Sequence, residues 1–233
     1  MLTELLASDP QSIADVIAIL ESIDSSLAPA DGLKWFNSLY LQITQAVAAR
    51  VAAKDFANPD WIAQLDVQFA KLYLRALRSS LAGEPAPDCW QVLFDSRADT
   101  RIARIQFALA GVNAHINHDL CAAVVATCRA TGVTPAHGAA PYADYTALNS
   151  TLDAQIDSAK QTLHVRLLGD ALPPVSHLED TLAAWNVAAA RETAWCNSEI
   201  LWNMGALSDV FLGTLDGLAT VIGKALLVPV PSA

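Results

Sequence analysis

Residues 106–120 place six polar side chains in a segment that is otherwise strongly apolar. The segment reads Q-F-A-L-A-G-V-N-A-H-I-N-H-D-L, and apolar positions recur every three or four residues in and around it. This spacing is typical of a helix packed on a core, not of a β-strand. The positions that define it are Ile102, Ile105, Leu109, Val112, Ile116 and Leu120. Any fold of this chain must therefore bury a helix with many polar groups.

Buried amides and imidazoles are costly unless they are hydrogen-bonded, so these side chains need partners on neighbouring helices or a ligand. On a helix that turns about 100° per residue, His115 and Asp119 form one i,i+4 pair, and Asn113 and Asn117 form another. His118 lies about 100° from Asp119 around the axis. We therefore expect a bound ion to share His115 with one of these two neighbours more easily than with both.

Two interpretations of the segment are open. In the first, His115 is a proton shuttle near neutral pH, Asp119 orients it, and Asn113 and Asn117 donate hydrogen bonds to a developing oxyanion. In the second, the same residues form a satisfied polar network that fixes the register of the helix.

The composition limits the fold class and the partners. With 233 residues, of which 53% are hydrophobic and 16% charged, the chain can bury a large core, and we expect a single domain over residues 1–233. The apolar excess predicts a large core, a homodimer interface or a cavity for an apolar small molecule. A net charge of −10 without clustered Lys and Arg argues against nucleic acid and an anionic membrane surface as partners.

The four cysteines show neither C-x-x-C spacing nor the density of a disulfide framework. Cys121 and Cys128 are seven residues apart, which is about 10 Å along a helix and too far for a disulfide. We therefore expect reduced thiols in a cytoplasmic protein, and the N-terminus lacks the basic region of a signal peptide. Three charged side chains interrupt the apolar tail over residues 207–230, which favours a packed helix over a membrane span.

Apolar periodicity and capping signals predict an all-α bundle of seven or eight mostly long helices. Asn58 before Pro59 marks one helix start, and the S-H-L-E sequence at Ser176 marks another as a capping box. Gly111 lowers helix propensity by about 1 kcal/mol, which predicts the close approach of another backbone or a ligand. The predicted helices cover residues 11–27, 31–47, 58–83, 90–94, 98–130, 144–167, 176–205 and 208–224, with a lid over residues 132–141 and a frayed tail over residues 223–233.

The motif at residues 106–120 resembles that of a bacterial family catalogued as a domain of unknown function. Supporting stretches are W-F-N-S-L-Y at residues 35–40, L-D-V-Q-F-A-K-L-Y at residues 65–73 and A-R-E-T-A-W at residues 190–195. The resemblance covers most of the chain and implies a fold and the place of a site, without an established activity.

Several familiar sites are excluded by spacing. The chain has no H-E-x-x-H zinc motif, no Glu-x-x-His pair of the ferritin-like type, no G-x-S-x-G, no P-loop, no G-x-G-x-x-G and no aspartate-rich diphosphate motif. What remains is a site without a metal, or an unusual metal site, formed between facing helices. The side chains expected to bind a substrate there are Trp35, Asn37, Tyr40, Asp66, Tyr73, His118, Arg191 and Trp195.

Three hypotheses on function follow. The first is an enzyme without a cofactor that acts on a small apolar molecule by acid–base catalysis, through hydrolysis, elimination, isomerisation or cyclisation. The second is a zinc or iron enzyme whose ligands are His115, His118, Asp119 and Glu192. The third is a bundle that binds a ligand or has a structural role, without catalysis. In the third case Asp66 pairs with Arg191 only to lock two helices, and His137, His164 and His177 are expected to be solvated.

Overall fold

A computed structural model describes residues 6–167 and 186–229, and every regular element in these ranges is a helix. The predicted all-α class and single-domain bundle are thus confirmed. In chain order the elements are α2 (Ile13–Ser26), α3 (Leu33–Ala52), α4 (Pro59–Ala82), α5 (Asp88–Ser96), α6 (Arg104–Ala114), η1 (His115–Asp119), α7 (Leu120–Thr131), α8 (Ala140–Ala147), α9 (Asn149–Leu167), α11 (Val187–Asn203), η2 (Gly205–Leu207) and α12 (Ser208–Leu226).

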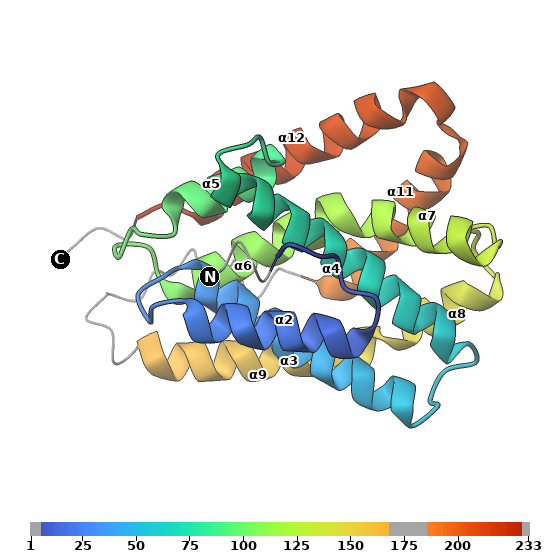
Figure 1. Cartoon of the computed structure of the whole chain (residues 1–233), viewed down its shortest axis with the longest axis horizontal. Helices are drawn as coiled ribbons and strands as arrows, with labels where there is room; N and C mark the ends of the chain where they lie inside the picture. Colours follow the sequence, from blue (N-terminus) through green and yellow to red (C-terminus); the bar gives the residue numbers. More distant parts are fainter. Residues whose placement is uncertain (1–5, 168–185, 230–233) are drawn as a thin grey trace.

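The segments α6, η1 and α7 follow one another without a break and form the central rod of the bundle. Figure 1 shows α2, α3 and α9 along one side of this rod and α12 on the opposite side. Helix α3 packs against α2, α6 and α9, whereas α7 packs against α4 and α11. Helix α12 covers α5 and α6. The polar segment identified in the sequence therefore lies in the middle of the molecule.

Local signals set several helix ends. The side chain of Asn58 accepts a hydrogen bond from the backbone N–H of Trp61, and Pro59 is the first helical residue, so the predicted start of α4 is confirmed. Gly83 ends the same helix with a φ of +71°, a conformation that glycine adopts without strain. The capping box predicted at Ser176 lies outside the described residues.

The central rod differs from the single helix predicted over residues 98–130. It begins at Arg104, and residues 115–119 form a π-helix instead of an α-helical turn. A π-turn widens the helix by one residue and shifts the angular positions of the side chains that follow. Periodicity cannot reveal such an insertion when the apolar positions on both sides remain in phase.

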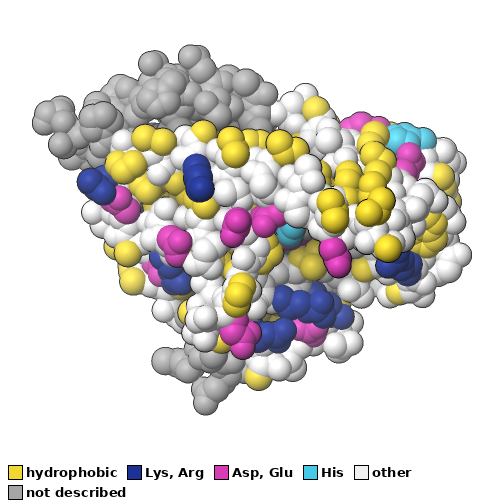
Figure 2. Space-filling view, turned by 90° about the horizontal axis from the view of Figure 1, so that it is seen from above, with side chains coloured by type: hydrophobic (Ala, Val, Ile, Leu, Met, Phe, Trp, Pro, Cys, Tyr) yellow, Lys and Arg dark blue, Asp and Glu magenta, His cyan; other side chains and the backbone are white. Residues whose placement is uncertain are grey.

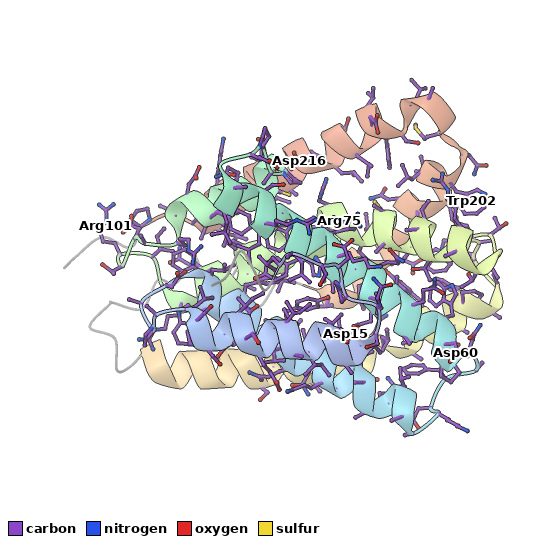
Figure 3. The ribbon with its side chains drawn as sticks, viewed as in Figure 1. Asp15, Asp60, Arg75, Arg101, Trp202 and Asp216 are labelled. Carbon is purple, nitrogen blue, oxygen red and sulfur yellow. The ribbon has the colours of Figure 1, made fainter. Side chains whose placement is uncertain are left out.

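The C-terminal segment is held more firmly than the predicted frayed tail. Helix α12 extends to Leu226, and the side-chain amide of Gln106 donates hydrogen bonds to the carbonyl oxygens of Leu226 and Val228. In the middle of α12, Asp216 accepts hydrogen bonds from the backbone N–H groups of Asp88 and Cys89 at the start of α5 (Figure 3). The prediction of fraying from residue 223 is therefore wrong for residues 223–228.

Helix α12 carries a stripe of exposed apolar side chains, and Figure 2 shows apolar side chains gathered on this face of the molecule. The stripe consists of Val210, Leu218, Val221 and Ile222, and Leu207 of η2 comes just before it. Among the described residues, one helical stretch, Gly205–Leu226, is long enough and apolar enough to cross a membrane. Of its most apolar 18-residue part, 17% is buried inside the molecule. The predicted homodimer would pack most favourably on this stripe.

The predicted close approach at Gly111 is a contact with an aromatic ring. A Cβ atom added to Gly111 would lie 2.3 Å from the side chain of Phe36, which is buried in the core. Gly213 in α12 has open space around the same position. The two glycines therefore differ in their surroundings although both are helical.

We expect Gly111→Ala to lower the free energy of unfolding by about 1–3 kcal/mol, because Phe36 cannot move out of a filled core without strain. Gly213→Ala is the matched control and should raise the free energy of unfolding by about 0.5–1 kcal/mol through helix propensity. Urea denaturation of both variants measures the difference. Equal effects of the two substitutions would contradict the close packing of Phe36 on the central rod.

Candidate functional site

The carboxylate of Asp119 is the centre of a buried polar cluster. Its Oδ2 atom accepts hydrogen bonds from the indole N–H of Trp90 and from Nδ1 of His115, each at 2.9 Å. Its Oδ1 atom lies 2.7 Å from Nδ1 of His118. Because an ionised carboxylate only accepts, both imidazoles donate through Nδ1, and their Nε2 atoms point away from Asp119.

The π-turn explains why Asp119 reaches both histidines. On a regular α-helix His118 and Asp119 would point in directions about 100° apart. Asp119 nevertheless contacts both His115 and His118, whereas the expectation about how a bound ion would share His115 stays a prediction. π-turns of this kind are common at functional sites.

Asp119, His115 and His118 shift one another's pKa values. Burial alone would raise the pKa of the Asp119 carboxyl, but the hydrogen bonds from His115 and His118 outweigh it and lower this pKa. Burial lowers the pKa of His115 although Asp119 opposes the shift. Burial lowers the pKa of His118, but the hydrogen bond to Asp119 and the negative charges of Asp119 and Asp216 together outweigh burial, so this pKa is raised. Near neutral pH the cluster therefore holds an ionised Asp119 and a neutral His115.

Aromatic rings surround the imidazole of His115. The ring of Phe69 stacks on it with centroids 3.4 Å apart and planes within 6°, and the ring of Tyr40 meets it edge-on at 4.7 Å. The Nε2 atom of His115 is buried and has no hydrogen-bond partner. His115 is therefore a neutral base whose lone pair is closed off from solvent by aromatic walls.

A cavity of about 40 Å³ lies on the other side of Tyr40 and Phe69. Its wall includes apolar side chains from α3, α4, α7 and α9, and three polar side chains, those of Tyr40, Asp66 and Arg191. All three belong to the predicted substrate-binding set. A volume of this size holds a few water molecules or a very small ligand.

The polar groups of the cavity are incompletely paired. The Oδ2 atom of Asp66 is buried without a hydrogen-bond partner. The hydroxyl groups of Tyr40 and Thr44 lie near each other on α3 without a well-formed hydrogen bond. Unpaired buried polar groups of this kind cost about 1–3 kcal/mol each. Their concentration beside a cavity indicates a place where a ligand or water completes the hydrogen bonds.

Asp66 is the most strongly perturbed acid of the cavity. Burial raises its pKa to about 7. The proposed ion pair with Arg191 does not form, because the guanidinium group of Arg191 donates to the side chain of Asn149 and to the carbonyl of Tyr145. Asp66 thus keeps both its protonated and its ionised form accessible near neutral pH.

The other predicted site residues have different neighbours. The amide of Asn113 donates to the carbonyl of Ala219 on α12, and the amide of Asn117 donates to Asn113, so neither amide is directed at the cavity. Asn37 donates to the carbonyl of Leu20 and accepts from Tyr73, which joins α2, α3 and α4. Trp35 lies under the guanidinium group of Arg104 and does not line the cavity.

The metal site predicted from His115, His118, Asp119 and Glu192 is not assembled. Glu192 instead lies beside His137 and accepts a hydrogen bond from Tyr142. Among the described residues, the group that brings three or more metal-ligating atoms together is His137, Glu192 and Cys196. Trp195, also predicted to bind substrate, donates its indole N–H to Glu199 in this second cluster.

Three features of this region are not found by reading the sequence. Trp90 completes the Asp119 cluster from α5, and Phe69 separates His115 from the cavity. In the sequence both residues have the spacing of ordinary core residues, and no local pattern distinguishes them from other core residues. His137 is exposed, as expected, but the sequence does not reveal that its ring lies between the carboxylates of Glu192 and Glu199 on α11. The segment predicted as a lid is thus attached to α11, and none of its residues lines the cavity.

We expect the stability of the protein to fall between pH 5 and pH 7 because of Asp66. Its folded pKa of about 7 exceeds the ordinary value of 3.8, so the folded state keeps a proton that the unfolded state loses. The stabilisation is complete below the unfolded pKa and disappears as the pH rises through 7, with a slope of up to about 1.4 kcal/mol per pH unit. Urea denaturation of the wild type and of Asp66→Asn at pH 5 and pH 7 measures the free energy of unfolding. The decrease from pH 5 to pH 7 should be about 1–2 kcal/mol smaller in the variant than in the wild type. Equal losses would place Asp66 in contact with solvent.

The comparisons with known proteins give a family but no activity. No curated protein matches this chain, and no solved structure matches it. The profile of a family of unknown function, DUF5995, matches residues 13–229, which include the central rod, the Asp119 cluster and the cavity. The chain therefore belongs to DUF5995, a family of unknown function.

Proposed function

We propose that this protein is an enzyme that acts on a small apolar molecule by acid–base catalysis in the cavity between α3, α4, α7, α9 and α11. Asp66 is the group that exchanges a proton with the substrate. The hydroxyl of Tyr40 donates a hydrogen bond to a substrate oxygen, and the positive charge of Arg191 stabilises negative charge that develops there. Such a reaction consists of proton transfers and needs no redox cofactor.

The observation that carries the proposal is the raised pKa of Asp66 together with its unpaired carboxylate oxygen. A general acid or base works best when its pKa lies near the working pH, because both protonation states are then available. Burial gives Asp66 a pKa of about 7, and its free Oδ2 atom belongs to a residue that lines the cavity. A carboxyl retained only for stability would be expected to have its oxygens paired.

The Asp119 cluster holds in place the side chains that pack against the cavity wall. It fixes the tautomer and orientation of His115, whose ring packs against Tyr40 and Phe69 in the cavity wall. His115 reaches a substrate only if the ring of Phe69 moves aside, and its lone pair then becomes a second proton acceptor. His115 thus packs behind the cavity wall, whereas Asp66 is one of the residues that line the cavity.

The size and lining of the cavity select the substrate class. Leu148, between α8 and α9, and Leu152 of α9 line the cavity together with apolar side chains of α3, α4 and α7, among them Ile43, Ile62 and Leu120. Only a very small molecule fits the present volume of about 40 Å³. A larger apolar substrate requires α9 to move away from α3.

Turnover of a fixed set of small compounds tests the proposal. Suitable probes are very small: methyl formate for ester hydrolysis, ethylene oxide for epoxide opening and acetone in D₂O for proton exchange. We expect the wild-type protein to accelerate at least one of these reactions over buffer, and Asp66→Asn to reduce that rate by roughly 100-fold or more. The rate should follow the ionisation of one group near pH 7.

Asp60→Asn is the matched control, because Asp60 is exposed in the first turn of the same helix (Figure 3). This variant should retain the wild-type rate. A rate that Asp60→Asn and Asp66→Asn leave equally unchanged would refute catalysis by Asp66. The absence of turnover together with a ligand-induced rise in melting temperature would favour the alternative of a non-catalytic binding bundle.

A further inference from the structure

A second polar cluster lies between α11 and the segment that joins α7 to α8. His137 comes from this connecting segment, and Glu192 and Cys196 come from one face of α11, four residues apart. One ligand atom from each of these three residues lies within 4.8 Å of the others. The cluster shares no residue with the wall of the cavity.

Neighbouring residues orient these groups. The Oε1 atom of Glu199 lies 2.7 Å from Nδ1 of His137 and also accepts hydrogen bonds from the backbone N–H of His137 and the indole N–H of Trp195. On the other side, the hydroxyl of Tyr142 donates to Oε2 of Glu192 at 2.8 Å. Trp195 is fully buried, so Glu199 is fixed to the core.

This arrangement matches the surroundings of metal-binding histidines. Such a histidine usually donates one ring N–H to a carboxylate, which fixes the tautomer and leaves the other nitrogen for the metal. Glu199 holds Nδ1 of His137 in this way, and Nε2 then faces Glu192 at 2.7 Å. An ion pair between exposed groups would need no such second carboxylate, no buried indole and no neighbouring thiol.

We propose that His137 Nε2, the carboxylate of Glu192 and the thiolate of Cys196 bind a divalent cation of the zinc class. Imidazole, carboxylate and thiolate together are ligands that suit Zn²⁺, and three protein ligands leave a fourth position for water. Binding replaces the proton between His137 and Glu192, and the thiol proton of Cys196 is released to solvent. The cation also connects α11 to the segment before α8.

Titration of the full-length reduced protein with Co²⁺ tests the site, because a cobalt–thiolate bond gives a charge-transfer absorption in the near ultraviolet. We expect one Co²⁺ per chain with this absorption, and its loss when Zn²⁺ is added. Cys196→Ser should abolish the absorption, and His137→Gln and Glu192→Gln should abolish stoichiometric binding. Glu199→Gln should weaken binding by roughly 10- to 100-fold, since it removes only the group that orients His137.

Glu84→Gln is the control, because Glu84 is exposed in the loop after α4 and does not belong to this cluster. It should leave the cobalt absorption unchanged. Circular dichroism establishes that each variant is folded, and Zn²⁺ should raise the melting temperature of the wild type but not of Cys196→Ser. Either of two results would overturn the proposal: no cobalt absorption in the wild type, or absorption that persists in folded Cys196→Ser. A third contrary result is absorption that is lost in Cys196→Ser but retained in His137→Gln and Glu192→Gln, because the cobalt is then bound by the thiol alone.

Discussion

The structure depends on one buried carboxylate with three hydrogen-bond donors. An ionised Asp119 in an apolar core would be strongly destabilising alone, because burial removes the water that stabilises its charge. Trp90, His115 and His118 replace that water from α5 and from the π-turn itself. Removal of any one donor leaves the charge partly unpaired. The cluster therefore ties the conformation of the central rod to the position of α5.

Other polar residues of the rod attach it to the rest of the bundle. Gln106 and Asn113 donate hydrogen bonds to backbone carbonyls of the C-terminal region, which fixes α12 against the rod. Gly111 lets Phe36 of α3 approach the opposite side closely. With these helices fixed, the aromatic side chains around His115 are closely packed, and two of them, Tyr40 and Phe69, are part of the cavity wall. The polar load of the rod thus has a packing role as well as a chemical one.

The sequence predicts the local parts of this arrangement well and the long-range parts poorly. The i,i+4 contact of His115 and Asp119 and the cap at Asn58 depend on residues close in the chain, and both are confirmed. The contact of His118 with Asp119 depends on the π-turn, which leaves no signature in apolar spacing. The cavity and the surroundings of His137 depend on helices distant in sequence. Tyr40, Asp66 and Arg191 were each expected to bind substrate, but nothing local shows that they meet at one cavity while Trp35 and Asn113 do not.

Two buried carboxyl groups in this core are pushed in opposite directions by their surroundings. Asp119 is ionised because three donors satisfy its oxygens, whereas Asp66 retains a proton up to about pH 7 because burial is unopposed. Pairs of titratable groups whose environments separate their pKa values identify the acid–base roles in a site. This asymmetry supports the roles proposed above, in which Asp119 is a fixed charge that orients its neighbours and Asp66 exchanges a proton. If both carboxyls served only to hold helices together, the second would be expected to have donors too, and the core supplies them only to the first.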